Sequence, residues 1–173
     1  NHGIVIAEIR NGEPVKIENN TIKVDTGTGI AKHFKSSIKV SNNTITSKNA
    51  TLDLYGGGDN EINNNKLTLL PNDNGDIAIV YVNTSSIENT IFDTVKLSLC
   101  NNSFFGDKVT RQSIQIISTN VSELFEDKGI LNNSYINCTF NVNKSNYKLK
   151  KENQYVKLVS KDGLMGEYTA LKF

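Results

Sequence analysis

A short motif built on a pair of asparagines recurs along the chain. It consists of an apolar residue, any residue, two asparagines, a polar residue and a second apolar residue. The motif reads IENNTI at 17–22, VSNNTI at 40–45 and INNNKL at 62–67, a spacing of 22 to 23 residues. A fixed period of this length is typical of solenoids, in which each repeat forms one coil that stacks on the next. The repeat therefore predicts a stack of coils.

Later copies of the motif keep its composition but not its spacing. LCNNSF occupies 99–104, YINCTF occupies 135–140, and a shortened copy, IENTI, occupies 87–91. Asn64 and Asn101 are 37 positions apart, and Asn101 and Asn137 are 36 apart. Two readings are open for these long intervals. Each is either one coil with an inserted loop or two short coils.

Between the asparagine pairs the chain reads as short β-strands. Segments such as 38–40, 52–55 and 114–117 are rich in β-branched residues and alternate in polarity. No apolar period of 3.6 residues is sustained, and the one expected helix is short, from Ser122 as its cap to Gly129 as its stop. We therefore expect an all-β fold, a right-handed single-stranded parallel β-helix over residues 1–142.

The recurring asparagines have a physical role in such a fold. Asparagine tolerates the left-handed backbone region, and its amide can satisfy backbone groups at a turn. Turns stacked at the strand spacing of about 4.8 Å would allow each amide to bond to the next. An inward amide needs that partner, because leaving it unpaired costs about 1–3 kcal/mol. The predicted ladder comprises Asn19, Asn20, Asn42, Asn43, Asn64, Asn65, Asn101, Asn102 and Asn137.

Composition offers a simpler explanation for part of this pattern. The chain has 25 asparagines among 173 residues, and an AT-rich genome would favour Asn, Ile and Lys together. The alternative to a solenoid is an asparagine-rich β-sandwich in which the motifs cluster by chance. The shared register of the first three copies favours the solenoid.

The strings IENNTI, VSNNTI and INCTF resemble the repeat of the pectate-lyase-like right-handed β-helix superfamily. That superfamily includes pectate lyases, polygalacturonases and bacteriophage tailspikes or appendages, and the resemblance covers residues 1–142. It implies a sheet face that binds or cuts polysaccharide and, for a tailspike, a homotrimer in the virion tail or outside the cell. The composition is most similar to that of a phage tailspike. Because residue 1 is not Met and strand-like residues follow at once, we expect a C-terminal fragment of a longer protein.

One stretch resembles part of a polygalacturonase site. Asn1, His2 and Gly3 are similar to the Gly-His-Gly turn of that family, and Lys32 matches the Lys of its Arg-Ile-Lys string, whereas Ile30 replaces the Arg. The resemblance implies catalytic roles for His2 and Lys32. The paired aspartates of the family have no counterpart here, although glycoside hydrolysis needs two positioned carboxylates.

A carbohydrate-binding face would need aromatic rings for the apolar side of a sugar and acids or amides for its hydroxyl groups. Asp53 and Tyr55 alternate on one expected strand and so share a face. Tyr81 and Lys96 lie on later strands, where they could become neighbours of that pair along the solenoid. The alternative is that all four are ordinary exterior residues.

Several other functions receive no support from the sequence. A net charge of +1 argues against a nucleic-acid partner, and no apolar run is long enough to insert into a membrane. We expect no metal and no cofactor, because the chain has only two histidines and no nucleotide-binding motif. Gly56–Asp59 and Asp73–Asp76 are expected to be turns rather than a phosphate loop and a calcium loop. Cys100 and Cys138 are expected to be small stacking residues rather than a disulfide.

The last segment, 143–173, loses the asparagine motif and carries six lysines between 144 and 161. We expect it to form a short β cap on the last coil or to pair with a neighbouring subunit. The leading hypothesis for the whole chain is a tailspike-like protein that recognises, and by extension depolymerises, a bacterial surface polysaccharide. The rivals are a polygalacturonase-like glycoside hydrolase whose site is completed upstream of residue 1 and a non-catalytic structural scaffold. The sequence leaves open whether the chain is an enzyme. If it is one, we expect a polysaccharide hydrolase or lyase.

Overall fold

The computed structural model describes residues 1–7, 12–33, 36–71, 78–83, 96–106, 113–117, 130–131, 133–142, 145–152, 155–160, 163–164 and 171–172. Strands are the only regular elements over these ranges, and none of the described residues belongs to a helix long and apolar enough to cross a membrane. The short helix expected at 122–129, the shortened motif at 87–91 and the turn at 73–76 lie outside the described residues.

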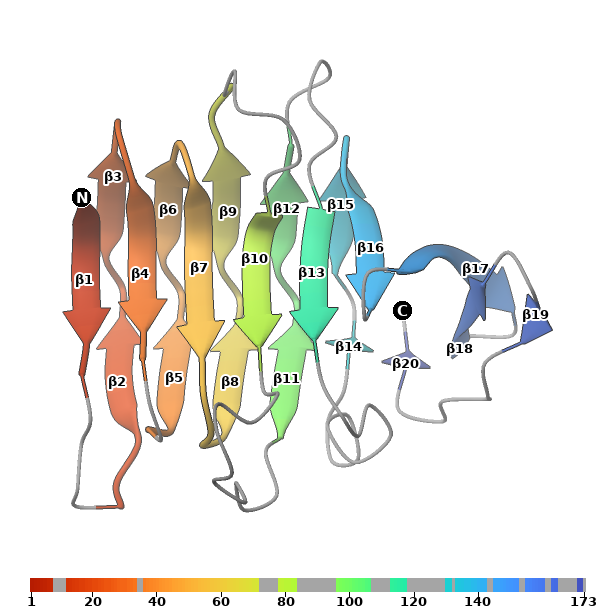
Figure 1. The fold of residues 1–173 in the computed structure, drawn as a ribbon, viewed down its shortest axis with the longest axis horizontal. Coiled ribbons are helices and arrows are strands. Elements are labelled where there is room, and N and C mark those ends of the chain that lie inside the picture. The colour runs from red at the N-terminus through yellow and green to blue at the C-terminus, as the bar shows by residue number, and fades with distance from the viewer. Residues whose placement is uncertain are drawn as a thin grey trace.

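The chain forms a single-stranded parallel β-helix, in which each strand pairs with the strand three places later in the chain (Figure 1). Sheet A contains β1 (His2–Ile6), β4 (Thr28–Lys32), β7 (Ala50–Tyr55), β10 (Ala78–Asn83), β13 (Ser113–Ile117) and β16 (Thr139–Val142). Sheet B contains β2 (Val15–Glu18), β5 (Ile38–Ser41), β8 (Asn60–Asn63), β11 (Leu97–Cys100) and β14 (Ile130–Leu131). Sheet C contains β3 (Thr21–Val24), β6 (Thr44–Ser47), β9 (Lys66–Leu69), β12 (Ser103–Phe105) and β15 (Ser134–Ile136).

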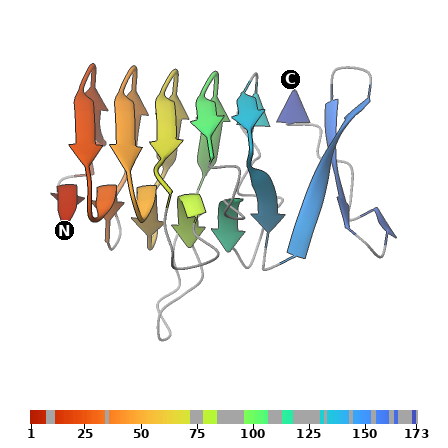
Figure 2. The same cartoon turned by 90° about the horizontal axis from the view of Figure 1, so that it is seen from above.

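The coils advance along one axis. In Figure 1 the chain runs down the front through sheet A, returns behind through sheets B and C, and moves from left to right, which is a right-handed coil. Figure 2 shows the successive coils side by side along that axis, with the N-terminus at one end. The predicted fold class, an all-β right-handed parallel β-helix, is confirmed.

The core consists of apolar columns that run from coil to coil. In sheet A the column is Ile30, Leu52, Val80 and Ile114, all paired in register and all fully buried. Sheets B and C each contribute a similar column, because the apolar residues that flank the asparagine pair point inward. Burial of each such side chain contributes about 1.5–3 kcal/mol. The columns of sheets B and C are Ile17, Val40, Ile62 and Leu99, and Ile22, Ile45, Leu67 and Phe104.

The strand pairing decides between the two readings of the long intervals. β8 pairs directly with β11, and β9 pairs directly with β12, although Asn64 and Asn101 are 37 residues apart. The interval is therefore one coil with an insertion. The extra residues fall between β9 and β11, so the three strands of the coil keep their registers.

The last copy of the motif requires a correction. β11 pairs with β14 and β12 pairs with β15, so the coil after Asn101 begins at Ile130 and its motif reads ILNNSY at 130–135. The copy expected at 135–140 instead spans the turn between β15 and β16. Its order of apolar and polar residues matches that of the other copies of the motif, but its turn lies at a different corner of the coil.

In sheet A the parallel pairing ends at β16, whereas in sheet B it continues from β14 to a strand of the C-terminal segment. β17 (Ser145–Glu152) pairs antiparallel with β16 and with β18 (Tyr155–Ser160). β19 (Gly163–Leu164) pairs with β18, and β20 (Leu171–Lys172) pairs with β14. Two strands of the C-terminal segment thus occupy the edges of the last strands of sheets A and B, at the end of the stack opposite the N-terminus (Figure 2).

Candidate functional site

The first asparagine of each pair forms the bend between sheets B and C. Asn19, Asn42, Asn64 and Asn101 have φ angles of 59°, 57°, 57° and 56°. This left-handed region is disfavoured for most residues, and asparagine adopts it readily. These four side chains are exposed, so they do not form the core of the ladder, contrary to the expectation that both members of each pair would do so.

The second asparagine of each pair forms the ladder. The backbone N–H and Nδ2 of Asn43 both donate to Oδ1 of Asn65, at 2.9 and 3.1 Å. The remaining Nδ2 hydrogen of Asn43 reaches the carbonyl of Ile17 in the preceding coil at 2.8 Å. The same pattern recurs at Asn65 and Asn102, so each of these three amides joins three coils. The rungs are Asn20, Asn43, Asn65, Asn102 and Asn133.

Asn137 is not a rung of this ladder. The amide of Asn102 donates to Oδ1 of Asn133, at 3.1 Å, which fills the position expected for Asn137. Asn137 has a φ of 53° and lies at the turn after β15, where its Nδ2 donates to the carbonyl of Gly106 at 3.4 Å. Its geometry is that of a bend residue at a different corner.

Lys32 is a core residue. It pairs in register with Ile6 and Leu54, both inward-facing, and its side chain has no solvent exposure. Its Nζ donates to the carbonyl of Ser36 at 3.0 Å and to the carbonyl of Gly57 at 2.8 Å. Burial lowers the pKa of Lys32 to about 8, although the Asp59 carboxylate partly opposes the shift. Lys32 therefore ties the turn of its own coil to the turn that follows β7.

The structure does not bring His2 and Lys32 together. His2 is exposed and pairs with Thr28, at the opposite end of β4 from Lys32. Lys32 points into the interior, whereas a polysaccharide could reach only the exterior. The pairing of these two residues implied by the polygalacturonase resemblance is thus absent, because Lys32 occupies an inward position of the alternating strand.

Three of the four expected carbohydrate-binding residues share the outer face of sheet A. Asp53 of β7 pairs in register with Tyr81 of β10, and Tyr55 lies two positions further along β7 and pairs with Asn83. The Nδ2 of Asn83 donates to the hydroxyl oxygen of Tyr81 at 3.2 Å. Paired positions on neighbouring strands lie about 4.8 Å apart. Asp53, Tyr55 and Tyr81 are therefore adjacent on one surface.

Two histidines complete this group on the N-terminal side. His33 follows β4, where its backbone N–H donates to the carbonyl of Ile6 at 3.0 Å, and it is half-buried. Burial raises the pKa of Asp53, and the charges of His33 and then of His2 act in the opposite direction. Both imidazoles are thus electrostatic neighbours of the carboxylate. We call this group the Asp53 cluster, which comprises His2, His33, Asp53, Tyr55, Tyr81 and Asn83.

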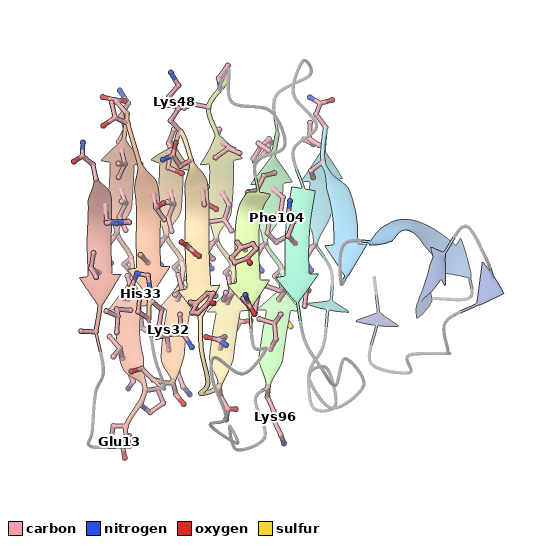
Figure 3. The ribbon with its side chains drawn as sticks, viewed as in Figure 1. Glu13, Lys32, His33, Lys48, Lys96 and Phe104 are labelled. Carbon is pink, nitrogen blue, oxygen red and sulfur yellow. The ribbon has the colours of Figure 1, made fainter. Side chains whose placement is uncertain are left out.

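Lys96 lies apart from the Asp53 cluster. It precedes β11, and its backbone N–H donates to Oδ1 of Asp59 at 3.1 Å, near the turn that leads into sheet B. Figure 3 places Lys96 at the lower edge of the view and shows Lys32 and His33 near each other at the end of β4. Lys96 is therefore not a member of the same face as Asp53 and Tyr81.

The remaining candidate sites have simple structural roles. Cys100 is buried and Cys138 is half-buried, and neither forms a disulfide. Burial raises the pKa of Cys138 to about 11, which suppresses the reactive thiolate. Gly56 and Gly58 adopt φ angles of 91° and 89° in the turn between β7 and β8. Over the described ranges, no three His, Cys, Asp or Glu side chains converge to hold a metal ion.

Comparison with known proteins adds no further assignment, since no family model, no curated protein and no solved structure matches the chain significantly.

Sequence reasoning missed His33 and Asn83 as members of the cluster. Both residues lie at the end of a strand, at the level of Tyr55. The sequence reveals this position only when it is known which strands pair. Once the period of 22 residues is extended from Asn42 to Asn64, His33 falls one coil before Tyr55. Asn83 could not be found this way, because some of the extra residues come before β10, so the step from Tyr55 to Asn83 is 28 residues instead of 22.

Proposed function

We propose that this protein binds a bacterial surface polysaccharide through the outer face of sheet A, in the manner of a phage tailspike. The observation that carries the proposal is the alignment of Asp53 with Tyr81, with Tyr55 on the same face. Aromatic rings can pack on the apolar face of a sugar, and the Asp53 carboxylate can bond to its hydroxyl groups. A solenoid presents such groups along a line, as a polymer requires.

Support for the site also comes from the burial of the sheet surface. Ala31 pairs in register with both Val5 and Asp53, and it has no exposure, whereas Val5 is 56% exposed. The outer face of sheet A is therefore covered at Ala31, directly beside Asp53. Partial burial of Asp53 makes its hydrogen bonds to a ligand stronger than bonds at an open surface.

Depolymerisation of the polysaccharide needs a catalytic group that binding does not need. Acid–base cleavage of a glycosidic bond uses two carboxylates about 5–9.5 Å apart. Asp53 is the one carboxylate of the Asp53 cluster, so a hydrolase would need a second acid from elsewhere. We propose that the working protein is a homotrimer located in a virion tail or outside the cell. In this scheme the C-terminal segment caps the last coil or pairs with a neighbouring subunit.

The test is binding to an array of bacterial surface glycans, with the wild type and two aromatic variants. Tyr55→Ala with Tyr81→Ala removes both rings of the cluster and should abolish binding. Phe105→Ala is the matched control, because this ring lies on sheet C, where Lys66 Nζ is 5.5 Å from its centroid. Absence of binding by the wild type would favour the scaffold role, and equal loss in both variants would remove the sheet A face as the site.

A further inference from the structure

We infer that the Asp53 cluster takes an amine-bearing ligand, and specifically a glycan with N-deacetylated hexosamine units. The inference rests on the proposed function and adds the chemical class of the sugar. It depends on the carboxylate of Asp53 and on the two tyrosines beside it.

The carboxylate of Asp53 has no bonding partner in the described part of the chain. No hydrogen bond and no salt bridge reaches it there, and it is half-buried. Partial burial without a partner is unfavourable for an ionised group. A cationic amine would offset this penalty directly, since hydrogen bonds between charged groups are about twice as strong as neutral ones.

The tyrosines favour a cation over a neutral group. Tyr81 lies directly across from Asp53, and Tyr55 lies two positions along the same strand. A cation near the face of an aromatic ring gains about 0.5–2 kcal/mol. The hydroxyl oxygen of Tyr81 accepts from Asn83, which leaves its own hydrogen free to donate to a sugar oxygen. An anionic sugar would instead meet the charge of Asp53.

The outward row that contains Asp53 offers no competing cation. Val5, Ala31, Tyr81 and Gln115 are paired in register with Asp53 across sheet A, and none of them is a cation. Asp53 is therefore the group of this row that an amine would meet.

The experiment is isothermal titration calorimetry of the full chain with three tetrasaccharides of the same backbone. These are β-1,4-linked glucosamine, its N-acetylated form and its N-trimethylated form, which keeps its charge at every pH. We expect the trimethylated form to bind on the order of tenfold tighter at pH 7.5 than the acetylated form. The glucosamine form, whose amines are only partly protonated at this pH, should bind with intermediate affinity.

The variants are Asp53→Asn and its matched control Asp25→Asn, which changes an exposed carboxylate in the turn after β3 that pairs with Lys23. Asp53→Asn should erase the preference for cationic sugars, and Asp25→Asn should keep it, with circular dichroism confirming that both are folded. Equal binding of acetylated and cationic forms by the wild type overturns the amine inference and leaves the glycan function standing. Failure of all three tetrasaccharides to bind, while other glycans bind on the array, also overturns it.

Discussion

Asn65 and Asn102 lie 37 residues apart in the chain and occupy neighbouring rungs of one ladder, with Nδ2 of Asn65 3.0 Å from Oδ1 of Asn102. The preceding rung, Asn43, is only 22 residues from Asn65, and its bond has the same geometry. The spatial period of the solenoid is thus independent of the number of residues in a coil. What fixes it is the stacking of the corner between sheets B and C.

Replacing a buried rung should destabilise the fold strongly. Asn65→Ala removes the acceptor for Asn43 and the donors to Asn102 and to the carbonyl of Val40, at 2.8 Å. Each buried polar group left unpaired costs about 1–3 kcal/mol, so we expect a loss of about 3–5 kcal/mol in the free energy of unfolding. Urea denaturation followed by circular dichroism measures it.

The matched control is the neighbouring residue. Asn64 has a φ of 57° and is exposed, so Asn64→Gly should change the free energy of unfolding by less than about 1 kcal/mol. A loss in Asn64→Gly as large as that in Asn65→Ala would contradict the division of labour between the two asparagines of a pair.

The buried ammonium of Lys32 should make stability depend on alkaline pH. Burial lowers its pKa from 10.5 to about 8 in the folded chain, so the unfolded chain binds more protons between these values. Stability should therefore rise across that interval by about 3 kcal/mol. Lys32→Met lacks this group, and the difference in stability between wild type and variant should grow by that amount from pH 8 to pH 10.5.

Lys23→Met supplies the control for the same titration, because Lys23 is exposed and its Nζ lies 3.3 Å from Asp25. Because Lys23→Met retains the buried Lys32, its stability should rise over this pH range as that of the wild type does. A flat difference for Lys32→Met would mean that the Lys32 ammonium is hydrated in solution rather than enclosed.

Asp53, on the proposed binding face, should reduce the stability of the folded chain at neutral pH. Burial raises its pKa above the ordinary 3.8, so the folded chain holds its proton to a higher pH than the unfolded chain. Its ionised form therefore disfavours folding at pH 7, and Asp53→Asn should be the more stable protein there. Thermal melts should show this advantage shrinking as the pH falls toward 3.8; a lower melting temperature for the variant at pH 7 would count against it.

Gly29 is needed where sheet C meets sheet A. A Cβ at this position would lie 2.5 Å from Cγ2 of Ile45 and 2.6 Å from the carbonyl oxygen of Thr51. Because Thr51 contributes backbone atoms, the clash is not relieved by a rotamer change, and Gly29→Ala should cost about 1–3 kcal/mol. Gly12→Ala, with no atom within 4 Å, isolates backbone strain at its φ of 74°. A smaller loss in Gly29→Ala than in Gly12→Ala would refute the packing argument.

The fold was predictable because three neighbouring motifs share one period. Asn19, Asn42 and Asn64 mark the same corner of successive coils, and the apolar residues beside them fall into the buried columns. Asn137 was misassigned because asparagine serves equally well at any left-handed bend. The pairing of β11 with β14 distinguishes the two corners, and that pairing is not visible in a motif of six residues.

The candidate site was predictable only where it depends on alternation within one strand. Asp53 and Tyr55 share a face by their spacing alone, whereas the proximity of Tyr81 requires the register between β7 and β10. Lys32 could not be recognised as a core residue, since lysine is almost never fully buried. Its reason for burial, the two carbonyls of Ser36 and Gly57, exists only once the turns are stacked.

The bonds that join one asparagine rung to the next all run in one direction, from the donors of one rung to the side-chain oxygen of the following rung. The amide dipoles consequently add instead of cancelling, and the stack is polar along its axis. Its first described rung, Asn20, turns an oxygen toward the N-terminal end. Two copies of the chain with these ends in contact would place acceptor against acceptor. The ladder can therefore be extended at this end only by a coil that offers donors and runs in the same direction.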